Sequence, residues 1–581
     1  MLSQIDIGFK CKHCQWPINQ VLSVGLTLKF RLPCIKSNLY PLLIFIFTMF
    51  SNECVSYCVQ ARAKKFRKMG STTAEEVLDI DPIRVGRPRL EPYQRLLSRF
   101  YEPLFLLDSL GQTRGSHTAP SFNFNPRREQ SRRFLQNLCS ISDFRKGGST
   151  CTAIGLEELD TSHIFWVASN RETDQIVAFL RTALGALRAI AHPTGTADAC
   201  TDSEFGRMCI EIAAERIEAE KRCLRKFAND CLSILEKENA VSELVAWLQI
   251  IIRLDDHSEL CRFAYRHRHK VYVRELRRRA SKEEKQSSPT KLRSPFILVR
   301  HYIGRLAHHI RSSKALIEDS KDLSHLLDNH AICPIHAPSA VPPPIRDSHT
   351  NLRGILNRMF HQNSEEKNML KDGLLHLNNV VGIFDTFLRH YDGSALEVHA
   401  EIQVLEYFWK MRKPFAGDDR FIACSKPACL CCELYFRYHP ARVMLSSSHR
   451  KIWTKWSPPY VERFDHKSPA ARQQRDILNK MTQALRVQVS DHVIHFLPSK
   501  RWHPDSITNI TDTRRSSLCF DLLDVSDADD PETPSSINLQ CLQHKSTSSS
   551  NMKVPGSVET EANLDEVFDS EDGGTSLSGS T

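Results

Sequence analysis

The chain has 581 residues, more than one typical domain holds, so two or three folded units with unstructured ends are expected. Hydrophobic residues make up 41% and charged residues 25%, close to globular averages, which excludes a wholly disordered or fibrous protein. The net charge is +10. Since residues 521–581 hold 13 acidic side chains and two lysines, a net of −11, the rest of the chain carries +21. A basic body is compatible with a polyanionic partner, and an acidic tail with autoinhibition.

The 19 cysteines are odd in number and lack the dense, regular spacing of a small secreted scaffold. Several of them, such as Cys209 and Cys231, lie in segments expected to be helical. They favour reduced thiols and an intracellular location, in the cytoplasm or the nucleus.

Residues 1–68 form an N-terminal segment of uncertain status. The apolar run Leu39–Phe50 is shorter than the ~20 residues that a transmembrane helix needs, and it lies too far from Met1 for a signal peptide. A buried or poorly formed segment is favoured over the alternative of a membrane anchor, so no membrane association is assigned. Alternatively, the native protein begins at Met69, and residues 1–68 are not part of it.

A mixed, partly ordered region is expected over residues 69–156, followed by a mainly helical domain over 157–330. Apolar residues recur there at three- and four-residue spacing, which is typical of packed amphipathic helices. The expected helices are Thr173–Arg188, Ser203–Glu238 and Ala240–Arg253. Within the same domain, Arg262–Ala280 is strongly basic with two interleaved tyrosines. It is interpreted as a solvated helix face, with a phosphate-binding helix or a localisation signal as alternatives.

The proline-rich segment at 331–350 is expected to be a linker, because proline cannot continue a helix or a central strand. In the following region, 351–500, short β-type runs at 420–424 and 442–448 alternate with helical patterns at 355–389, 429–438 and 475–496. This alternation indicates a layered α/β domain. Residues 501–581 are rich in Ser, Thr and acidic residues and are expected to be disordered.

Two short motifs in the α/β region carry chemistry. In HAEIQVLEYF, His399 and Glu401 begin an apolar helical pattern, and in CLCC, Cys429 and Cys432 open a second helix after a strand and a turn. The N-terminus of a helix favours thiolate over thiol, and thiolate is the form that binds metal.

His399, Cys429 and Cys432 are therefore candidate ligands of one zinc ion. Three protein ligands leave a fourth tetrahedral position for water, which is typical of a catalytic zinc. Zinc lowers the pKa of that water, and Glu401 is placed to carry its proton without being a ligand. The neighbouring Cys424 and Cys431 are interpreted as buried apolar residues.

The segment HAEIQVLEYF … FIACSKPACLCCELYFRYHPARVMLSSSHRKIWTKWSPP resembles a fungal-expanded family of zinc deaminase-like domains related to bacterial toxin deaminases. The resemblance covers roughly residues 355–498 and implies a three-layer α/β/α fold with a mixed sheet of about five strands, preceded by a mainly α-helical domain. It implies His399, Cys429 and Cys432 as Zn²⁺ ligands and Glu401 as the acid/base. One departure is Ala428, which stands where such deaminases usually have proline.

The expected function is zinc-dependent hydrolytic deamination of a cytosine- or adenine-type base in nucleic acid or nucleotide, by attack of zinc-bound hydroxide with Glu401 as the proton shuttle. A single-stranded nucleic acid is one candidate partner. The alternative is an inactive, zinc-stabilised fold that serves as an interaction module. His449, Trp453 and Trp456 are expected either to line a base-stacking pocket or to pack in the core. The base, the polymer and the oligomeric state stay open.

Overall fold

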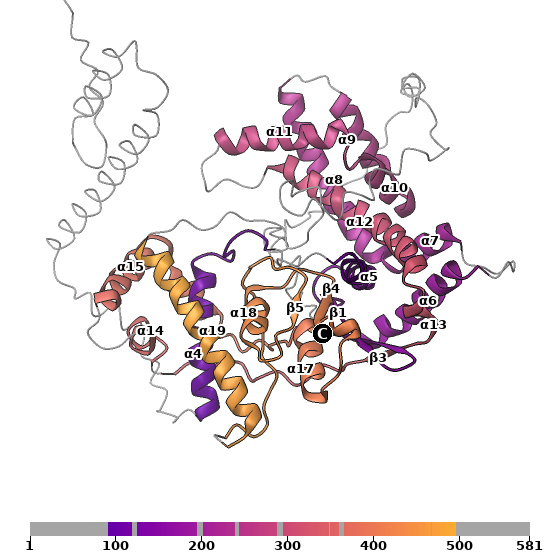
Figure 1. The fold of residues 1–581 in the computed structure, drawn as a ribbon. Coiled ribbons are helices and arrows are strands. Elements are labelled where there is room, and N and C mark those ends of the chain that lie inside the picture. The colour runs from indigo at the N-terminus through magenta and orange to yellow at the C-terminus, as the bar shows by residue number, and fades with distance from the viewer. Residues whose placement is uncertain are drawn as a thin grey trace, which may run out of the picture. The chain divides into compact units, whose positions relative to one another are not determined.

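The computed structural model describes residues 91–118, 125–193, 201–238, 243–286, 294–347, 349–359, 365–465 and 467–495 (Figure 1). The predictions for residues 1–68 and 501–581 lie outside the described residues. The described helices are α4 (Pro92–Ser109), α5 (Pro126–Ser142), α6 (Thr173–Ala191), α7 (Asp202–Ile212), α8 (Ala214–Lys237), α9 (Glu243–Arg253), α10 (His257–His267), α11 (Val271–Gln286), α12 (Pro295–Asp322), α13 (His325–Asp328), α14 (Leu352–Met359), α15 (Glu365–Val381), α16 (Ile383–Arg389), α17 (Ala400–Met411), the short 3₁₀ turn η1 (Ala416–Asp418), α18 (Leu430–Tyr438) and α19 (Pro469–Ile494).

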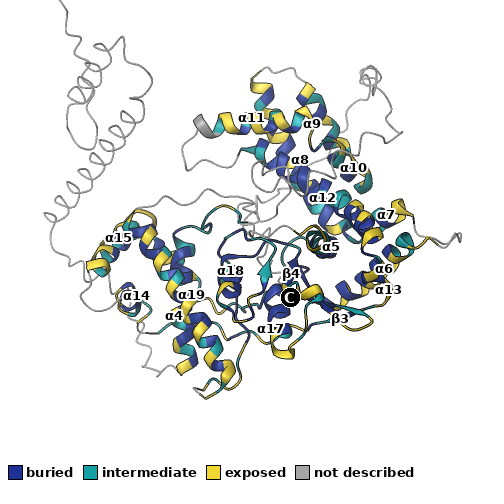
Figure 2. Ribbon diagram, viewed as in Figure 1, coloured by how far each residue is buried: buried dark blue, intermediate teal, exposed yellow. Residues whose placement is uncertain are grey.

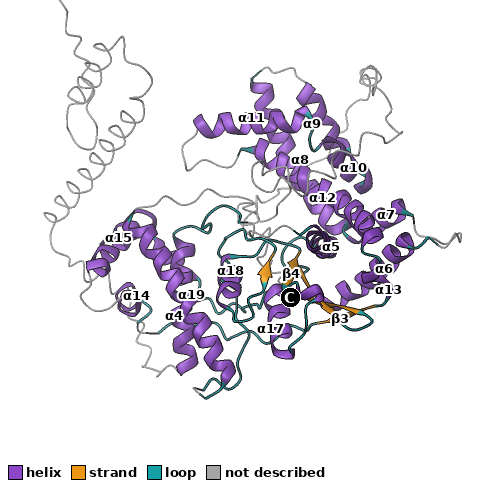
Figure 3. Ribbon diagram, in the orientation of Figure 1, coloured by secondary structure: helices purple, strands orange, loops and turns teal. Residues whose placement is uncertain are grey.

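The fold is helix-rich with one small mixed sheet of five strands (Figure 3). The strands are β1 (Thr152–Glu158), β2 (His163–Ser169), β3 (His330–Pro334), β4 (Phe421–Cys424) and β5 (Met444–Leu445), in the spatial order β3-β2-β1-β4-β5. The central strand β1 is antiparallel to both β2 and β4, while β3 and β5 pair in parallel with their neighbours at the two edges. The fold is thus compatible with the expected α/β class.

The order of the elements along the chain differs from the expected one. The hairpin β1–β2 precedes the helices α6–α12, yet β1 pairs directly with β4, with Ile154 opposite Ala423. The helices therefore lie between strands of one sheet, where a helical domain preceding the whole α/β unit was expected. The proline-rich segment likewise contributes Ala331–Pro334 to the edge strand β3. The remaining domain boundaries stay predictions.

Helices contact both faces of the sheet. On one face, α17 contacts β1, β2 and β4. Here the approach is so close that a Cβ atom added at Gly155 of β1 would lie 2.6 Å from the Phe408 ring. On the other face, Ile154 and Leu156 of β1 share a core with residues of α5 and α6. Side chains alternate along a strand, so β1 serves both faces.

The core on the α5 and α6 face continues into the helical region. Helix α12 contacts α5, α6, α7, α8, α10 and α11. Much of α12 is buried (Figure 2), and its apolar residues belong to the same buried cluster as Ile154 and Phe165 of the sheet. Buried ion pairs accompany this packing: Glu220 of α8 accepts from Arg305 of α12 at 2.8 Å and from Arg216 at 3.1 Å. Among the described helices, none is both long enough and apolar enough to cross a bilayer.

Candidate metal centre

The first candidate ligand stands at the start of α17. His399 is the N-cap residue, with extended backbone angles (φ −66°, ψ 149°), and the helix begins at Ala400. The backbone N–H of Ala400 donates to Oδ1 of Asn170 at 2.9 Å, and Asn170 Nδ2 donates to the carbonyl of Gly148 at 3.0 Å. Asn170, the residue directly after strand β2, therefore fixes the start of α17 at Ala400, which lies between His399 and Glu401.

The two candidate thiols stand at the start of α18. Cys429 is the N-cap residue, and its Sγ atom accepts from the backbone N–H of Cys432 at 3.4 Å. A sulfur at this place satisfies one of the N–H groups that a helix start leaves unpaired. The Cys-x-x-Cys spacing thus places both sulfurs in one helical turn.

Ser425 and Lys426 tie the loop before Cys429 to strand β1 and to the segment that precedes it. The backbone N–H of Ser425 donates to the Thr152 carbonyl at 2.9 Å, and the Thr152 N–H donates back to Ser425 Oγ at 3.1 Å. Lys426 Nζ donates to the Gly147 carbonyl at 2.5 Å and lies 4.0 Å from the buried Asp143 carboxylate. Ser425 and Lys426 therefore anchor the loop.

Residues 447–457, which we call the strap, connect the two helix starts. At one end, Ala428 N–H donates to the Ser447 carbonyl and Leu430 N–H to the Lys451 carbonyl, at 2.8 and 2.9 Å. At the other end, Ser457 N–H donates to the carbonyl of Glu397 at 2.8 Å, two residues before His399. The strap thus sets the two ligand-bearing segments relative to one another.

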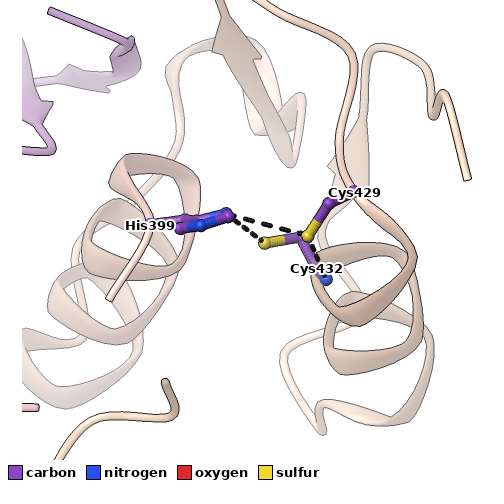
Figure 4. A group of neighbouring side chains, drawn as sticks. All are labelled: His399, Cys429 and Cys432. Carbon is purple, nitrogen blue, oxygen red and sulfur yellow. Dashed lines mark hydrogen bonds between the residues drawn. The ribbon is translucent and has the colours of Figure 1, made fainter. Parts of the chain in front are cut away.

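His399, Cys429 and Cys432 converge in the structure, and their ligand atoms all lie within 4.8 Å of one another (Figure 4). Nδ1 of His399 is 3.7 Å from Cys429 Sγ and 3.4 Å from Cys432 Sγ. A tetrahedral ion with Zn–S of about 2.3 Å and Zn–N of about 2.0–2.1 Å requires an S···N separation of about 3.6 Å. The three side chains therefore fit one zinc ion.

The electrostatics favour thiolate at one of the two sulfurs. Burial raises the pKa of Cys429, but its hydrogen bond with Cys432 and the charge of His399 lower that pKa to about 6. Burial lowers the pKa of His399, but the charge of Cys429 raises it to about 10. Burial raises the pKa of Cys432 well above its ordinary value. Thiolate is the metal-binding form of cysteine, so the lowered pKa of Cys429 favours it as a metal ligand.

Glu401 lies in the first turn of α17 and is 3% exposed. Its Oε2 atom accepts from the thiol of Cys424 at 4.0 Å, and its negative charge raises the pKa of both Cys432 and His399. The carboxylate is therefore next to the cluster. It is not among the three groups whose ligand atoms converge.

The other cysteines of this region lie outside the converging group. Cys431 is fully buried, and Cys424 Sγ lies 3.8 Å from Cys151 Sγ at the start of β1. The aromatic residues of the strap also pack: Trp456 is fully buried, and Trp453 Nε1 donates to His449 Nε2 at 3.4 Å. Sequence reasoning missed Asn170, because nothing local indicates that a residue 230 positions before Ala400 caps its helix.

Residues 398–460 match the family model of the OTT_1508-like deaminases. The chain carries a deaminase-like domain. The matched range includes His399, Glu401, Cys429 and Cys432, so the prediction of a deaminase-like domain with a group that can bind metal is confirmed. None of the curated proteins and none of the solved structures compared with the chain matches it.

Proposed function

We propose that the deaminase-like domain is a zinc-dependent hydrolytic deaminase that acts on a cytosine- or adenine-type nucleobase. The observation that carries this proposal is the convergence of His399 with Cys429 and Cys432 beside the buried carboxylate of Glu401. A separate carboxylate beside a three-ligand site distinguishes a catalytic zinc centre from a structural one with four protein ligands. The helices on both faces of the mixed sheet support a three-layer α/β/α arrangement for this domain.

The reaction exchanges the exocyclic amine of the base for a carbonyl oxygen from water and releases ammonia. His399, Cys429 and Cys432 would hold a zinc ion, which would supply the Lewis acid that makes a water molecule acidic near neutral pH. Glu401 takes up the proton that water loses on attacking the amidine carbon, and it delivers that proton to the ring nitrogen. The carboxylate then takes the remaining proton of the added hydroxyl group and delivers it to the departing amine, so that the carbonyl forms as the C–N bond breaks. Its burial restricts the exchange of these protons with bulk water.

We further propose that the base is presented in single-stranded nucleic acid. Deaminases reach the amidine carbon only in an unstacked base, which a single strand offers at low cost. The feature that supports a polyanion is a set of exposed basic residues on α10, α11 and the turn between them, here called the basic stripe: Arg262, Arg266, Lys270, Arg274 and Arg277.

The basic residues of the stripe are not neutralised by ion pairs with acidic side chains of the described residues. Its residues follow one another at intervals of four, four, four and three positions, and within the described part of the chain none of the five forms an ion pair. Neighbouring Arg278 and Arg279, in contrast, both pair with Glu275. Like charges four residues apart destabilise a helix by about 0.2–0.5 kcal/mol per pair, and a bound phosphate backbone offsets this repulsion.

The proposed activity is tested by ammonia release from a panel of bases, nucleosides, nucleotides and single-stranded oligonucleotides. The full chain is compared with Glu401→Gln and with Glu211→Gln, a control in which an exposed carboxylate far along the chain from the motif is neutralised. Loss of a general acid/base is expected to reduce the rate about 10²–10⁴-fold in Glu401→Gln, with zinc content unchanged, while Glu211→Gln retains wild-type activity.

Zinc retention without ammonia release by the wild-type chain, across the whole panel, would contradict the enzyme. That result would favour the zinc-stabilised interaction module instead. Equal activity of the wild type and Glu401→Gln would contradict the role of the carboxylate.

A further inference from the structure

A tryptophan outside the ligand set donates a hydrogen bond to one of the candidate metal ligands. The indole N–H of Trp456 donates to Cys432 Sγ at 3.2 Å, and Trp456 is fully buried. Trp456 lies on the strap, 24 residues after Cys432. A buried indole N–H normally has a partner, and here the partner is a candidate metal ligand.

The packing around Trp456 leaves its ring little freedom. Its ring centroid is 5.5 Å from that of Phe100 and 5.8 Å from that of Tyr435. Its backbone carbonyl accepts from the Tyr101 hydroxyl at 2.9 Å. Helices α4 and α18 therefore hold the indole at a fixed place, so the N–H cannot turn away from the sulfur without loss of core packing.

The backbone of Trp456 is also joined to the segment that carries His399. Glu397 forms a parallel bridge with Trp456, with hydrogen bonds from Glu397 N–H to the Lys455 carbonyl and from Ser457 N–H to the Glu397 carbonyl, both 2.8 Å. Trp456 thus donates to the sulfur ligand through its side chain. Its backbone lies beside Glu397, two residues before the imidazole ligand His399. A shift of this residue changes the separation of the two ligands.

We propose that Trp456 is a positioning residue of the metal centre, which orients Cys432 toward His399 through its hydrogen bond to Sγ. This inference rests on the proposed zinc site. Hydrogen bonds from outside the ligand set orient ligands and tune the metal, and their loss typically costs 10–100-fold in metal affinity. Within the described residues, the bond reaches Cys432, the thiol that converges with His399, and not the adjacent Cys431.

The test uses Co²⁺ as the probe, since its thiolate charge-transfer band reports the sulfur ligands without any assay of activity. The full chain is compared with Trp456→Phe and with a chain carrying 3-benzothienylalanine at position 456, which keeps the bicyclic ring but lacks the N–H. Trp453→Phe is the matched control, since Trp453 lies on the same strap and donates to His449. We expect both changes at position 456 to weaken Co²⁺ binding at least about 10-fold and to shift the band to lower energy, with Trp453→Phe unchanged.

Co²⁺ affinity within about twofold of wild type and an unshifted band in the benzothienyl variant would overturn the role of Trp456 alone. The same holds if only Trp456→Phe is affected, because this would assign the effect to the smaller ring and not to the N–H. Absence of a thiolate band in the wild-type chain would overturn the metal site, and both proposals with it. The two failures are therefore distinguishable.

Discussion

Nδ1 of His399 lies 3.4 Å from Sγ of Cys432, although 33 residues separate them along the chain. Each residue stands at the start of a different helix, and the strap joins the two starts. The contact is thus a product of the sheet and of the strap. It gives the separation that a tetrahedral zinc ion requires between a nitrogen and a sulfur ligand.

The two adjacent thiols at 431 and 432 are predicted to differ in function. Cys432→Ser removes a ligand and is expected to weaken zinc binding more than about 100-fold, since even changes outside the ligand set cost 10–100-fold. Cys431→Ser places a hydroxyl in a fully buried position and is expected to lower the free energy of unfolding by about 1–3 kcal/mol while zinc binding persists. Chelator competition and urea unfolding measure the two effects. Loss of zinc in Cys431→Ser, in folded protein, would contradict the assignment.

The close approach of α17 to β1 predicts a strong effect at one glycine. Gly155→Ala places a Cβ atom 2.6 Å from Phe408 and 2.8 Å from Val404, so these side chains of α17, or the helix itself, must shift. Overpacking of this kind is expected to lower the free energy of unfolding by about 1–3 kcal/mol. Because α17 begins beside His399, zinc affinity is expected to fall as well.

Gly185→Ala is the control for this substitution. Gly185 lies in α6, and nothing lies within 4 Å of an added Cβ atom. Alanine there is expected to stabilise the helix by up to about 1 kcal/mol, because glycine is the poorer helix former. Thermal unfolding of both variants checks the pair. A Gly155→Ala protein as stable as Gly185→Ala would show that the packing at β1 is looser than described.

The starts of the helices at the metal centre were predictable from local sequence. A turn-forming segment before Cys429 and the apolar pattern after His399 indicate both starts, and the observed helices begin one residue after each. Other boundaries were less accurate. The continuous helix predicted over 355–389 is interrupted at Gly382, which has a positive φ of 63° and stands before α16. A periodic apolar pattern alone does not reveal such a break.

The partners of the centre that lie far along the chain were not predictable. Strands β1 and β2 join the sheet from beyond a long helical segment, and the sequence gives no local sign of that pairing. Asn170 accepts from the backbone of Ala400, next to His399, and Trp456 donates to Cys432 Sγ; tertiary packing sets both hydrogen bonds. The sequence shows the aromatic ring of Trp456, with base stacking or core packing as alternatives, but the sulfur partner of its N–H depends on tertiary packing.

A buried carboxylate away from the metal centre predicts a pH dependence of stability. Burial raises the pKa of Glu102 to about 7, against 4.5 ordinarily, although the charge of Arg358 opposes the rise. Asp347 adds to it, Arg486 opposes it, and Tyr391 faces the same carboxylate. Between these pKa values the folded state keeps a proton that the unfolded state releases. The contribution of Glu102 to stability therefore falls as the pH rises from 4.5 to 7.

Urea unfolding of the wild type and of Glu102→Gln at a series of pH values isolates this effect. The free energy of unfolding of the wild type, relative to the variant, is expected to decrease between pH 5 and pH 7 and to level off above that. A difference that is constant with pH, or that grows as the pH rises, would show that Glu102 is ionised throughout.

The basic stripe predicts salt-dependent binding of single strands. Each phosphate contact to a single strand contributes about 0.7 to the slope of log affinity against log salt concentration. Replacing all five residues with glutamine is therefore expected to reduce the magnitude of this slope by up to about 3.5. Fluorescence anisotropy with a labelled oligonucleotide measures the slope. Arg207→Gln, which removes a cation already paired with Glu211, is the control and should leave it unchanged. An unchanged slope in the glutamine variant, or preference for anionic vesicles over the oligonucleotide, would contradict the nucleic-acid proposal.

Zinc K-edge X-ray absorption on the purified full chain, together with its zinc content, tests the metal centre most directly. We expect one zinc per chain with two sulfur neighbours at about 2.3 Å, one imidazole nitrogen at about 2.0–2.1 Å and one further light-atom ligand. His399→Ala should remove the imidazole signal. A first shell of three or four sulfurs, a spectrum that His399→Ala leaves unchanged, or a chain without zinc would contradict the proposed metal centre.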